Sequence, residues 1–179
     1  AACTSARVSW EELSPGSTGV APVAPPARSG HAMAYDAARG VVVLFGGVTF
    51  DGRNNVEQND TWEFNGTRWS QKRATGSVGS PDPRRDHAMV YDSHRGVTVL
   101  FGGFFRVREG ETWEWDGSTW SLRTNSGPAA RRDHRMAYDA IRHVTVLNGG
   151  ATGPEAPSGP AETWEWDGNS WTLRAATGP

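Results

Sequence analysis

The chain has 179 residues, enough for one domain that buries about 70% of its unfolded surface without disulfide bonds. Eighteen basic and twenty acidic residues give a formal charge of −2. This balance excludes the strongly basic surface that nucleic-acid binding needs, so we expect no nucleic-acid partner. The longest apolar run, "VVVLF", is far shorter than the roughly 20 residues of a membrane-spanning helix, so we also expect no membrane span.

The amino end carries two signals. Its "AAC" is similar to the end of a bacterial lipoprotein signal, with Cys3 as the lipidated residue. Because Cys3 is the only cysteine, it cannot form an internal disulfide bond. We therefore expect an extracellular, cell-surface or periplasmic protein, with Cys3 as a possible lipid anchor. Residues 7–15, "RVSWEELSP", predict a lone β-strand around Trp10.

The rest of the chain is a threefold repeat. The stretches "TWEFNGTRWS", "TWEWDGSTWS" and "TWEWDGNSWT" begin at Thr61, Thr112 and Thr163, with a period of 51 residues. Self-similarity at a fixed period of this size is typical of repeat architectures. The sequence therefore predicts three equivalent units within one domain of residues 1–179, at 27–76, 83–126 and 129–176.

Each unit predicts four short strands and no helix. The first is of the "HAMAYD" type and the second of the "GVVVLFGG" type, rich in the β-branched residues that suit a buried sheet. The third, "TWEF" or "TWEW", places two aromatic side chains two residues apart, hence on one face of a strand. The fourth is "RWSQ", "TWSL" or "SWTL". No run has the apolar period of about 3.6 residues that a helix requires, so the fold class is all-β.

A pair of turn residues separates the third strand from the fourth in every unit. These pairs are Asn65-Gly66, Asp116-Gly117 and Asp167-Gly168. Such pairs favour the two-residue type I′ hairpin, so we expect positive φ at both residues of each pair. The flanking tryptophans are expected to pack between neighbouring sheets, where the ring N–H can donate to a carbonyl.

Four antiparallel strands per unit, a glycine pair closing the second strand and tryptophans on the third and fourth resemble the kelch repeat. The resemblance covers about residues 8–176 and implies a β-propeller, similar to galactose oxidase, in which each repeat forms one blade with strands A to D from the channel outward. The implied fold is three four-stranded antiparallel blades. Residues 7–15 would then be the lone outer strand D of a preceding blade.

In such a blade the A–B and C–D turns lie at one face and the B–C and D–A connections at the other. The A–B and C–D turns are short and alike here, whereas the B–C loops are long and unlike. Variable loops on a rigid scaffold are where binding usually resides, so we expect a protein or glycan ligand on the long-loop face. The candidate residues combine aromatic side chains with arginines, amides and acids. They are Phe50, Arg53, Asn54, Asn55 and Glu57 in the first B–C loop and Phe104, Phe105, Arg106, Arg108 and Glu109 in the second.

Other interpretations of these loops remain open. Phe104 and Phe105 could instead cover the seam between two blades. The third loop, 151–161, is rich in proline and glycine and is interpreted as a spacer. A cation could bind the side-chain oxygens of the first loop, although their spacing matches no calcium-binding loop. The residues concerned are Asp51, Asn55, Glu57 and Asn59.

The segments "RSGH", "RRDH" and "RRDH", at 28–31, 84–87 and 131–134, are the most enzyme-like feature. A histidine beside an aspartate could be an oriented base or a metal ligand. The same residues recur in each unit, however, whereas catalysis ordinarily needs different residues in different roles. We therefore favour a structural role, with Arg and Asp bound to neighbouring backbone, and predict no catalytic or metal-binding residues. His94 and His143 fall in short turns and are expected to be solvated.

The resemblance leaves an enzyme as the alternative function. Kelch-type propellers include sugar oxidases, mutarotases and metal-dependent lyases, which would here use His, Asp and Arg side chains lining the channel. The copper site of galactose oxidase needs a crosslinked Tyr and Cys, which this sequence does not match, so we predict no cofactor. Asn59 and Asn65 begin "NDT" and "NGT", weak matches to the glycosylation pattern.

Closure of the propeller is the last expectation. Propellers have about four to eight blades, and three complete units cannot close a ring. We therefore expect self-association through open blade faces, or further blades from a longer chain, with either a closed ring or a filament as the result.

Overall fold

The computed structural model describes residues 24–105, 107–108, 110–152, 159 and 161–177. Within these residues every regular element is a β-strand, and three four-stranded antiparallel sheets account for most of them. Blade 1 consists of β2 (Ala32–Asp36), β3 (Val41–Phe45), β6 (Thr61–Phe64) and β7 (Trp69–Arg73). Blade 2 consists of β8 (Ala88–Asp92), β9 (Val97–Phe101), β12 (Thr112–Trp115) and β13 (Trp120–Thr124). Blade 3 consists of β14 (Arg135–Asp139), β15 (Val144–Asn148), β16 (Thr163–Trp166) and β17 (Trp171–Ala175).

Short strands lie outside the blades. β1 (Arg28–Ser29), β4 (Val48–Phe50) and β5 (Asn55–Glu57) form a small sheet, and β10 (Phe104–Phe105) pairs with β11 (Val107–Arg108). The sequence did not predict strands inside the B–C loops. The expected lone strand at 7–15 and the lipidation candidate Cys3 both lie outside the described residues.

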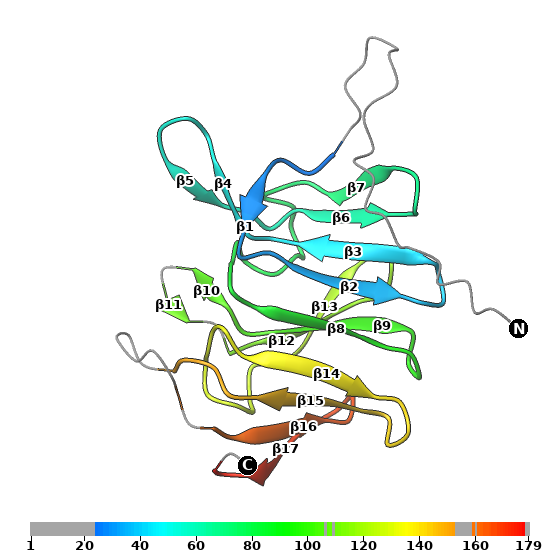
Figure 1. Cartoon of the computed structure of the whole chain (residues 1–179), viewed down its shortest axis with the longest axis vertical. Helices are drawn as coiled ribbons and strands as arrows, with labels where there is room; N and C mark the ends of the chain where they lie inside the picture. The colour runs from blue at the N-terminus through cyan, green and yellow to red at the C-terminus, as the bar shows by residue number, and fades with distance from the viewer. Residues whose placement is uncertain (1–23, 106, 109, 153–158, 160, 178–179) are drawn as a thin grey trace, which may run out of the picture.

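The three sheets are arranged as successive blades of a β-propeller (Figure 1). Each follows the predicted A-B-C-D order, and the A strands β2, β8 and β14 lie against one another. This confirms the expected all-β blade architecture.

Alternating apolar residues of one blade pack against the tryptophans of the next. The core between blades 1 and 2 is formed by Ala34, Val43, Phe45, Met89, Leu100, Trp115 and Trp120. Phe45 meets Trp120 edge-on with ring centroids 4.9 Å apart, and Phe101 meets Trp171 in the same way at 5.2 Å. Burial of each such side chain stabilises the fold by roughly 1.5–3 kcal/mol, so the interface between blades is a main source of stability.

A polar network crosses the same interface. Trp115 Nε1 donates to Glu63 Oε1 of the preceding blade at 3.1 Å, and Trp120 Nε1 donates to Thr61 Oγ1 at 2.9 Å. Trp166 and Trp171 bind Glu114 and Thr112 equivalently, at 3.1 and 2.8 Å. The acceptors of these four indoles are therefore not the expected carbonyls but a buried carboxylate or hydroxyl of the neighbouring C strand.

The carboxylate of Glu63 is itself held in place. Arg39, from the A–B turn of its own blade, binds Glu63 Oε1 and Asp36 Oδ2, each at 2.6 Å. Burial alone would raise the pKa of Asp36, but hydrogen bonds from Arg39 outweigh it and lower that pKa. Arg95 repeats this arrangement with Asp92 and Glu114. Each A–B turn thus fixes the acceptor that the next blade uses.

The C–D hairpin tips differ from the prediction. Only the glycine of each pair has positive φ, at 89°, 99° and 97° for Gly66, Gly117 and Gly168. Phe64 pairs with Trp69, which leaves a four-residue loop instead of a two-residue turn. The cause is the side chain of the first loop residue: Asn65 Oδ1 accepts the N–H groups of Thr67 and Arg68 at 3.1 and 3.0 Å. Asp116 and Asp167 do the same in the other blades.

Alanine substitutions at the three tips should have unequal costs. A left-handed backbone costs any non-glycine residue roughly 1–2 kcal/mol, and a Cβ on Gly66 would meet nothing within 4 Å. A Cβ on Gly117 would lie 2.8 Å from the Arg39 guanidinium. We expect Gly117→Ala to lower the denaturant midpoint more than Gly66→Ala, because it also displaces Arg39 from its carboxylates. Equal midpoints for the two variants would contradict this contact between blades.

Candidate functional site

The B–C hairpins project from one end of the blades, and the A–B turns lie at the other end (Figure 1). The first hairpin is β4–β5 and the second is β10–β11, and both lie on the left of the view. The side with these hairpins is called the loop face below. The predicted separation of long from short connections is therefore confirmed.

The tip of the β4–β5 hairpin is tightly built. Asp51 Oδ1 accepts the N–H groups of Arg53 and Asn54 at 2.8 and 2.7 Å, and the Asp51 N–H donates to the Asn54 carbonyl at 3.1 Å. These hydrogen bonds lower the pKa of Asp51. Phe50, directly before the turn, is 66% exposed. A large aromatic side chain is therefore presented to solvent at the end of a rigid turn.

The hairpin places the five candidate residues of the first B–C loop in two groups. Phe50 pairs with Asn55 and Val48 pairs with Glu57, so their side chains share one face of the two-stranded ribbon. Arg53 and Asn54 stand at its exposed tip. The structure thus brings Phe50, Asn55 and Glu57 to one face of the hairpin and places the other two candidates at its end.

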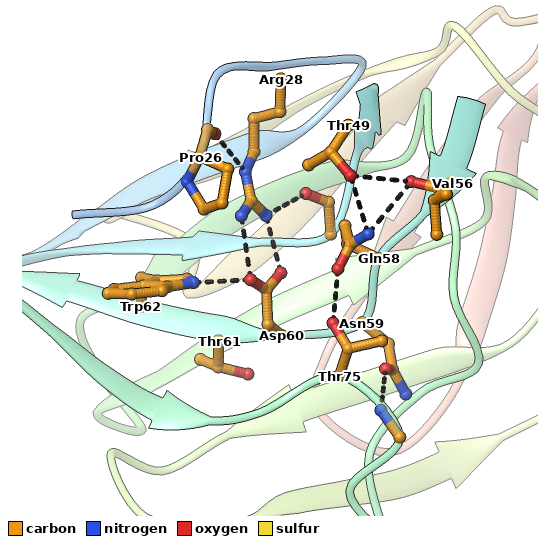
Figure 2. A network of polar contacts seen from close by, with 12 residues as sticks. Pro26, Arg28, Thr49, Val56, Gln58, Asn59, Asp60, Thr61, Trp62 and Thr75 are labelled. Atoms are coloured by element: carbon orange, nitrogen blue, oxygen red, sulfur yellow. Dashed lines mark hydrogen bonds and ion pairs between the residues drawn. The ribbon is translucent and has the colours of Figure 1, made fainter. Parts of the chain in front are cut away.

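The base of the hairpin is anchored to the D–A connection (Figure 2). Gln58 Nε2 donates to Thr49 Oγ1 at 2.9 Å, and Gln58 Oε1 accepts from Thr75 at 2.5 Å. Buried Asn59 donates to the Pro81 carbonyl and accepts the Gly76 N–H, at 3.1 and 2.8 Å. These hydrogen bonds fix the base of the β4–β5 hairpin to the D–A connection of the blade.

The second hairpin is joined through Arg85 to the same D–A connection, residues 74–87. Phe104 and Arg85 exchange backbone hydrogen bonds at 3.1 and 2.8 Å, and the guanidinium lies 5.3 Å from the Phe104 ring centroid. Phe104 and Phe105 are both half-buried, which leaves either of their two interpretations open. Of the other candidates, Arg108 lies in β11, whereas Arg106 and Glu109 are outside the described residues.

Two of the residues whose side-chain oxygens could bind a cation already form other interactions. Asp51 caps the hairpin tip and Asn59 is buried beneath it, each bound to backbone groups. Among the described residues no three His, Cys, Asp or Glu side chains are grouped as a metal centre. The first B–C loop is therefore organised by its own hydrogen bonds.

The first arginine of each "RRDH"-type segment is a structural clamp. Arg28 binds the Gly46 carbonyl at 2.8 Å and both oxygens of Asp60, and Asp60 also accepts from Trp62 Nε1 at 2.6 Å (Figure 2). Arg84 repeats this with the Gly102 carbonyl and Glu111, and Arg131 with the Gly149 carbonyl and Glu162. The predicted structural role of these arginines is confirmed. The first tryptophan of each "TWE" stretch completes the clamp.

The histidines of these segments are packing residues in blades 2 and 3. His87 and His134 are buried and meet Phe45 and Phe101 edge-on, at 5.6 and 5.5 Å. Burial, reinforced by Arg84 and Arg131, lowers the pKa of each imidazole to about 3. Both side chains are therefore neutral at physiological pH. His31, which is only half-buried, also has a lowered pKa, through burial and Arg28.

The aspartates of these segments have an unexpected conformation. Asp86 and Asp133 have positive φ, at 58° and 60°, and stand where blade 1 has Gly30. Their backbones form a ladder across blades: the Asp86 N–H donates to the Gly30 carbonyl and the Asp133 N–H to the Asp86 carbonyl, at 2.8 and 2.9 Å. Burial, with the nearby Asp133 charge, raises the pKa of Asp86. The glycine at the equivalent position of "RSGH" was the signal in the sequence that this position has a left-handed backbone.

Comparison with known proteins supports the fold alone. No protein-family model matches the chain, and a search of curated proteins finds no match. The solved structure of YjhT is similar over 83% of this chain at 15% sequence identity, with a TM-score of 0.63. The similarity covers 52% of the YjhT chain, so this chain spans about half of that length. Three propeller blades, with their loops at one end, thus define the architecture.

The described residues contain no helix long and apolar enough to cross a membrane.

Proposed function

We propose that the protein is a non-catalytic binding and assembly module of the kelch-repeat class, which holds a protein or carbohydrate ligand on its loop face. The observation that carries the proposal is the β4–β5 hairpin. It exposes Phe50 beside Arg53 and Asn54, and it is fixed to the blade by buried Asn59. An aromatic side chain and an arginine on a preorganised hairpin are the groups that dominate binding surfaces.

The buried positions of the residues that could act in catalysis favour a binding function over an enzymatic one. His87 and His134 are buried against phenylalanines, and Arg84 and Arg131 are fully buried in clamps. A general base must reach the proton that it removes, which these side chains cannot do from between the blades. The repeated histidines and arginines thus serve the scaffold, and the non-repeated loops remain for recognition.

The outermost blade surfaces support the assembly part of the proposal. In blade 1, Met33 and Tyr35 are 52% and 59% exposed, whereas the equivalent Met89 and Tyr91 of blade 2 are each 8% exposed against blade 1. A further blade, from a second copy or from a longer chain, would cover them. The far surface of blade 3 is more polar than expected, because Asn148 stands where Phe45 and Phe101 stand in the other blades.

Ligand capture tests the binding part. The loop-face variant combines Phe50→Ser, Arg53→Ala and Phe104→Ser, and the matched control combines Thr67→Ala and Arg68→Ala at an exposed C–D tip on the opposite face. Both proteins would be titrated on immobilised glycans and on extracellular proteins recovered by pull-down. Loss of hot-spot residues costs about 2 kcal/mol or more, so we expect at least about thirtyfold weaker binding for the loop-face variant alone. Unchanged affinity in that variant would place the site elsewhere.

A further inference from the structure

His94 and His143 lie at the end of the blades opposite the loop face and contact each other. They belong to the A–B turns of blades 2 and 3, and both side chains are exposed. Their imidazole rings stack with centroids 4.1 Å apart and planes 23° apart. The sequence predicted two separate solvated histidines, whereas the fold brings them together from neighbouring blades.

Neither histidine belongs to the repeat pattern. Ala38 stands at the position of His94 in blade 1, and glycine stands at the position of His143 in blades 1 and 2. His143 keeps the left-handed backbone of those glycines, with φ of 57° against 66° for Gly40 and 70° for Gly96. This conformation is unfavourable for a residue with a Cβ. The third turn thus accepts a strained residue whose ring rests on His94.

The turns that carry the two rings are held by other groups. The His94 N–H donates to Asp92 Oδ1 at 3.0 Å and approaches the Tyr138 hydroxyl at 3.3 Å. The nearby cations are already paired, Arg95 with Asp92 and Glu114, and Arg142 with Asp139 and Glu165. The two imidazoles therefore stand on turns that are held by other hydrogen bonds, next to arginines whose charges are already paired.

We propose that His94 and His143 form a binding site for a divalent transition-metal ion. Imidazole nitrogen binds Zn²⁺ at about 2.0–2.1 Å, so two nitrogens beside each other on one ion lie roughly 3 Å apart. The rings are stacked with centroids 4.1 Å apart, and the nitrogen lone pairs lie in the ring planes. Both side chains are exposed, so rotation about their side-chain torsions can turn one nitrogen of each ring toward a shared ion. Water or an external donor would complete the coordination. Imidazole sites favour Cu²⁺, Ni²⁺ and Zn²⁺, with Cu²⁺ bound most tightly.

This site is independent of the proposed loop-face function, since it lies at the opposite end of the blades. The buried imidazoles of His87 and His134 do not compete for the ion, because nearby side chains cover them. The proposal therefore predicts one site per chain, which depends on two residues from different blades.

Calorimetric titration with Ni²⁺ at pH 7.5 tests the proposal, and Ni²⁺ avoids the oxidation of a thiol by Cu²⁺. The variants are His94→Ala and His143→Gly, which restore the residues that blade 1 carries at Ala38 and Gly40, so both should fold. We expect one Ni²⁺ per wild-type chain and at least about tenfold weaker binding in each variant, because each loses one of the two imidazoles. Half-exposed His31 serves as the control, and His31→Asn should bind Ni²⁺ like the wild type.

Melting curves with and without Ni²⁺ give a second readout. A ligand that binds only the folded state raises the melting temperature, so Ni²⁺ should stabilise the wild type and neither variant. Wild-type protein that fails to bind Ni²⁺ below about 1 mM, or variants that bind it as tightly as the wild type, would overturn the proposal. Loss of stability in His94→Ala without any metal binding would show that the stack is a packing contact only, and would also overturn it.

Discussion

Arg84→Ala is expected to destabilise the protein by about 3 kcal/mol, the lower end of the cost of removing one partner from a buried ion pair, because Glu111 is partly exposed. The Arg84 side chain is fully buried and donates to the Asp82 carbonyl, the Gly102 carbonyl and the Glu111 carboxylate, at 3.0, 3.1 and 2.8 Å. Its removal would leave a carboxylate and a buried carbonyl without their cation. Urea unfolding followed by tryptophan fluorescence measures the loss.

Two further variants make this result specific. Arg68→Ala, at an exposed hairpin tip, removes the same charge and should change stability by no more than about 0.5 kcal/mol. The double variant Arg84→Met with Glu111→Leu removes the pair together and should lose less than the two single changes added, because no unpaired charge remains. A cost below about 1 kcal/mol for Arg84→Ala would contradict the clamp.

Stability should fall steeply as the pH drops from about 6.5 toward 3, because two histidines must be protonated on unfolding. An unfolded histidine binds a proton near pH 6.5, whereas the folded pKa of His87 and of His134 is about 3. Between these values the unfolded state binds more protons, so acid favours unfolding, by up to about 1.4 kcal/mol per pH unit for each histidine. Above pH 6.5 both histidines are neutral in the folded and the unfolded state, so this loss of stability is absent.

The histidines can be separated from the carboxylates by substitution and by pH range. The double variant His87→Met with His134→Met should show a much flatter dependence of unfolding free energy on pH between 6 and 4. Thr67→Ala, which changes an exposed residue without a titratable group, should keep the wild-type slope. The lowered pKa values of Asp36 and Asp92 place the carboxylate contribution at lower pH, in all three proteins. Equal slopes in the wild type and the double variant would contradict the burial of neutral histidines.

The strands were predictable because their patterns are local. Runs such as "VVVLF" and "TWEW" carry β-branched and aromatic residues at the spacing of a pleated strand, and the repeat confirmed each assignment three times. The side on which the long loops gather followed from the strand order alone. The hairpin tips were wrong in detail, because the Asn65 carboxamide competes with the backbone as a hydrogen-bond acceptor and lengthens the loop.

The contacts between distant segments could not be predicted. The clamp of Arg28 and Asp60 joins residues far apart in sequence. Its signal in the sequence was an acidic residue directly before the threonine and tryptophan that begin each C strand. Burial of His87 depends on Phe45 of the preceding blade. The stack of His94 on His143 depends on the rotation between two blades, which no local pattern records.

The repeated interface between blades is tested most directly by the mass of the 179-residue chain in solution. Trp120 and Trp171 each insert into the preceding blade, and Trp69 is the equivalent residue at the outer surface of blade 1, where it is half-buried. Exposed aromatic patches of this kind drive association. Sedimentation velocity with multi-angle light scattering should therefore give a multiple of 19.4 kDa. A monodisperse, cooperatively melting species of 19.4 kDa would contradict the proposal that the outer blade surfaces associate.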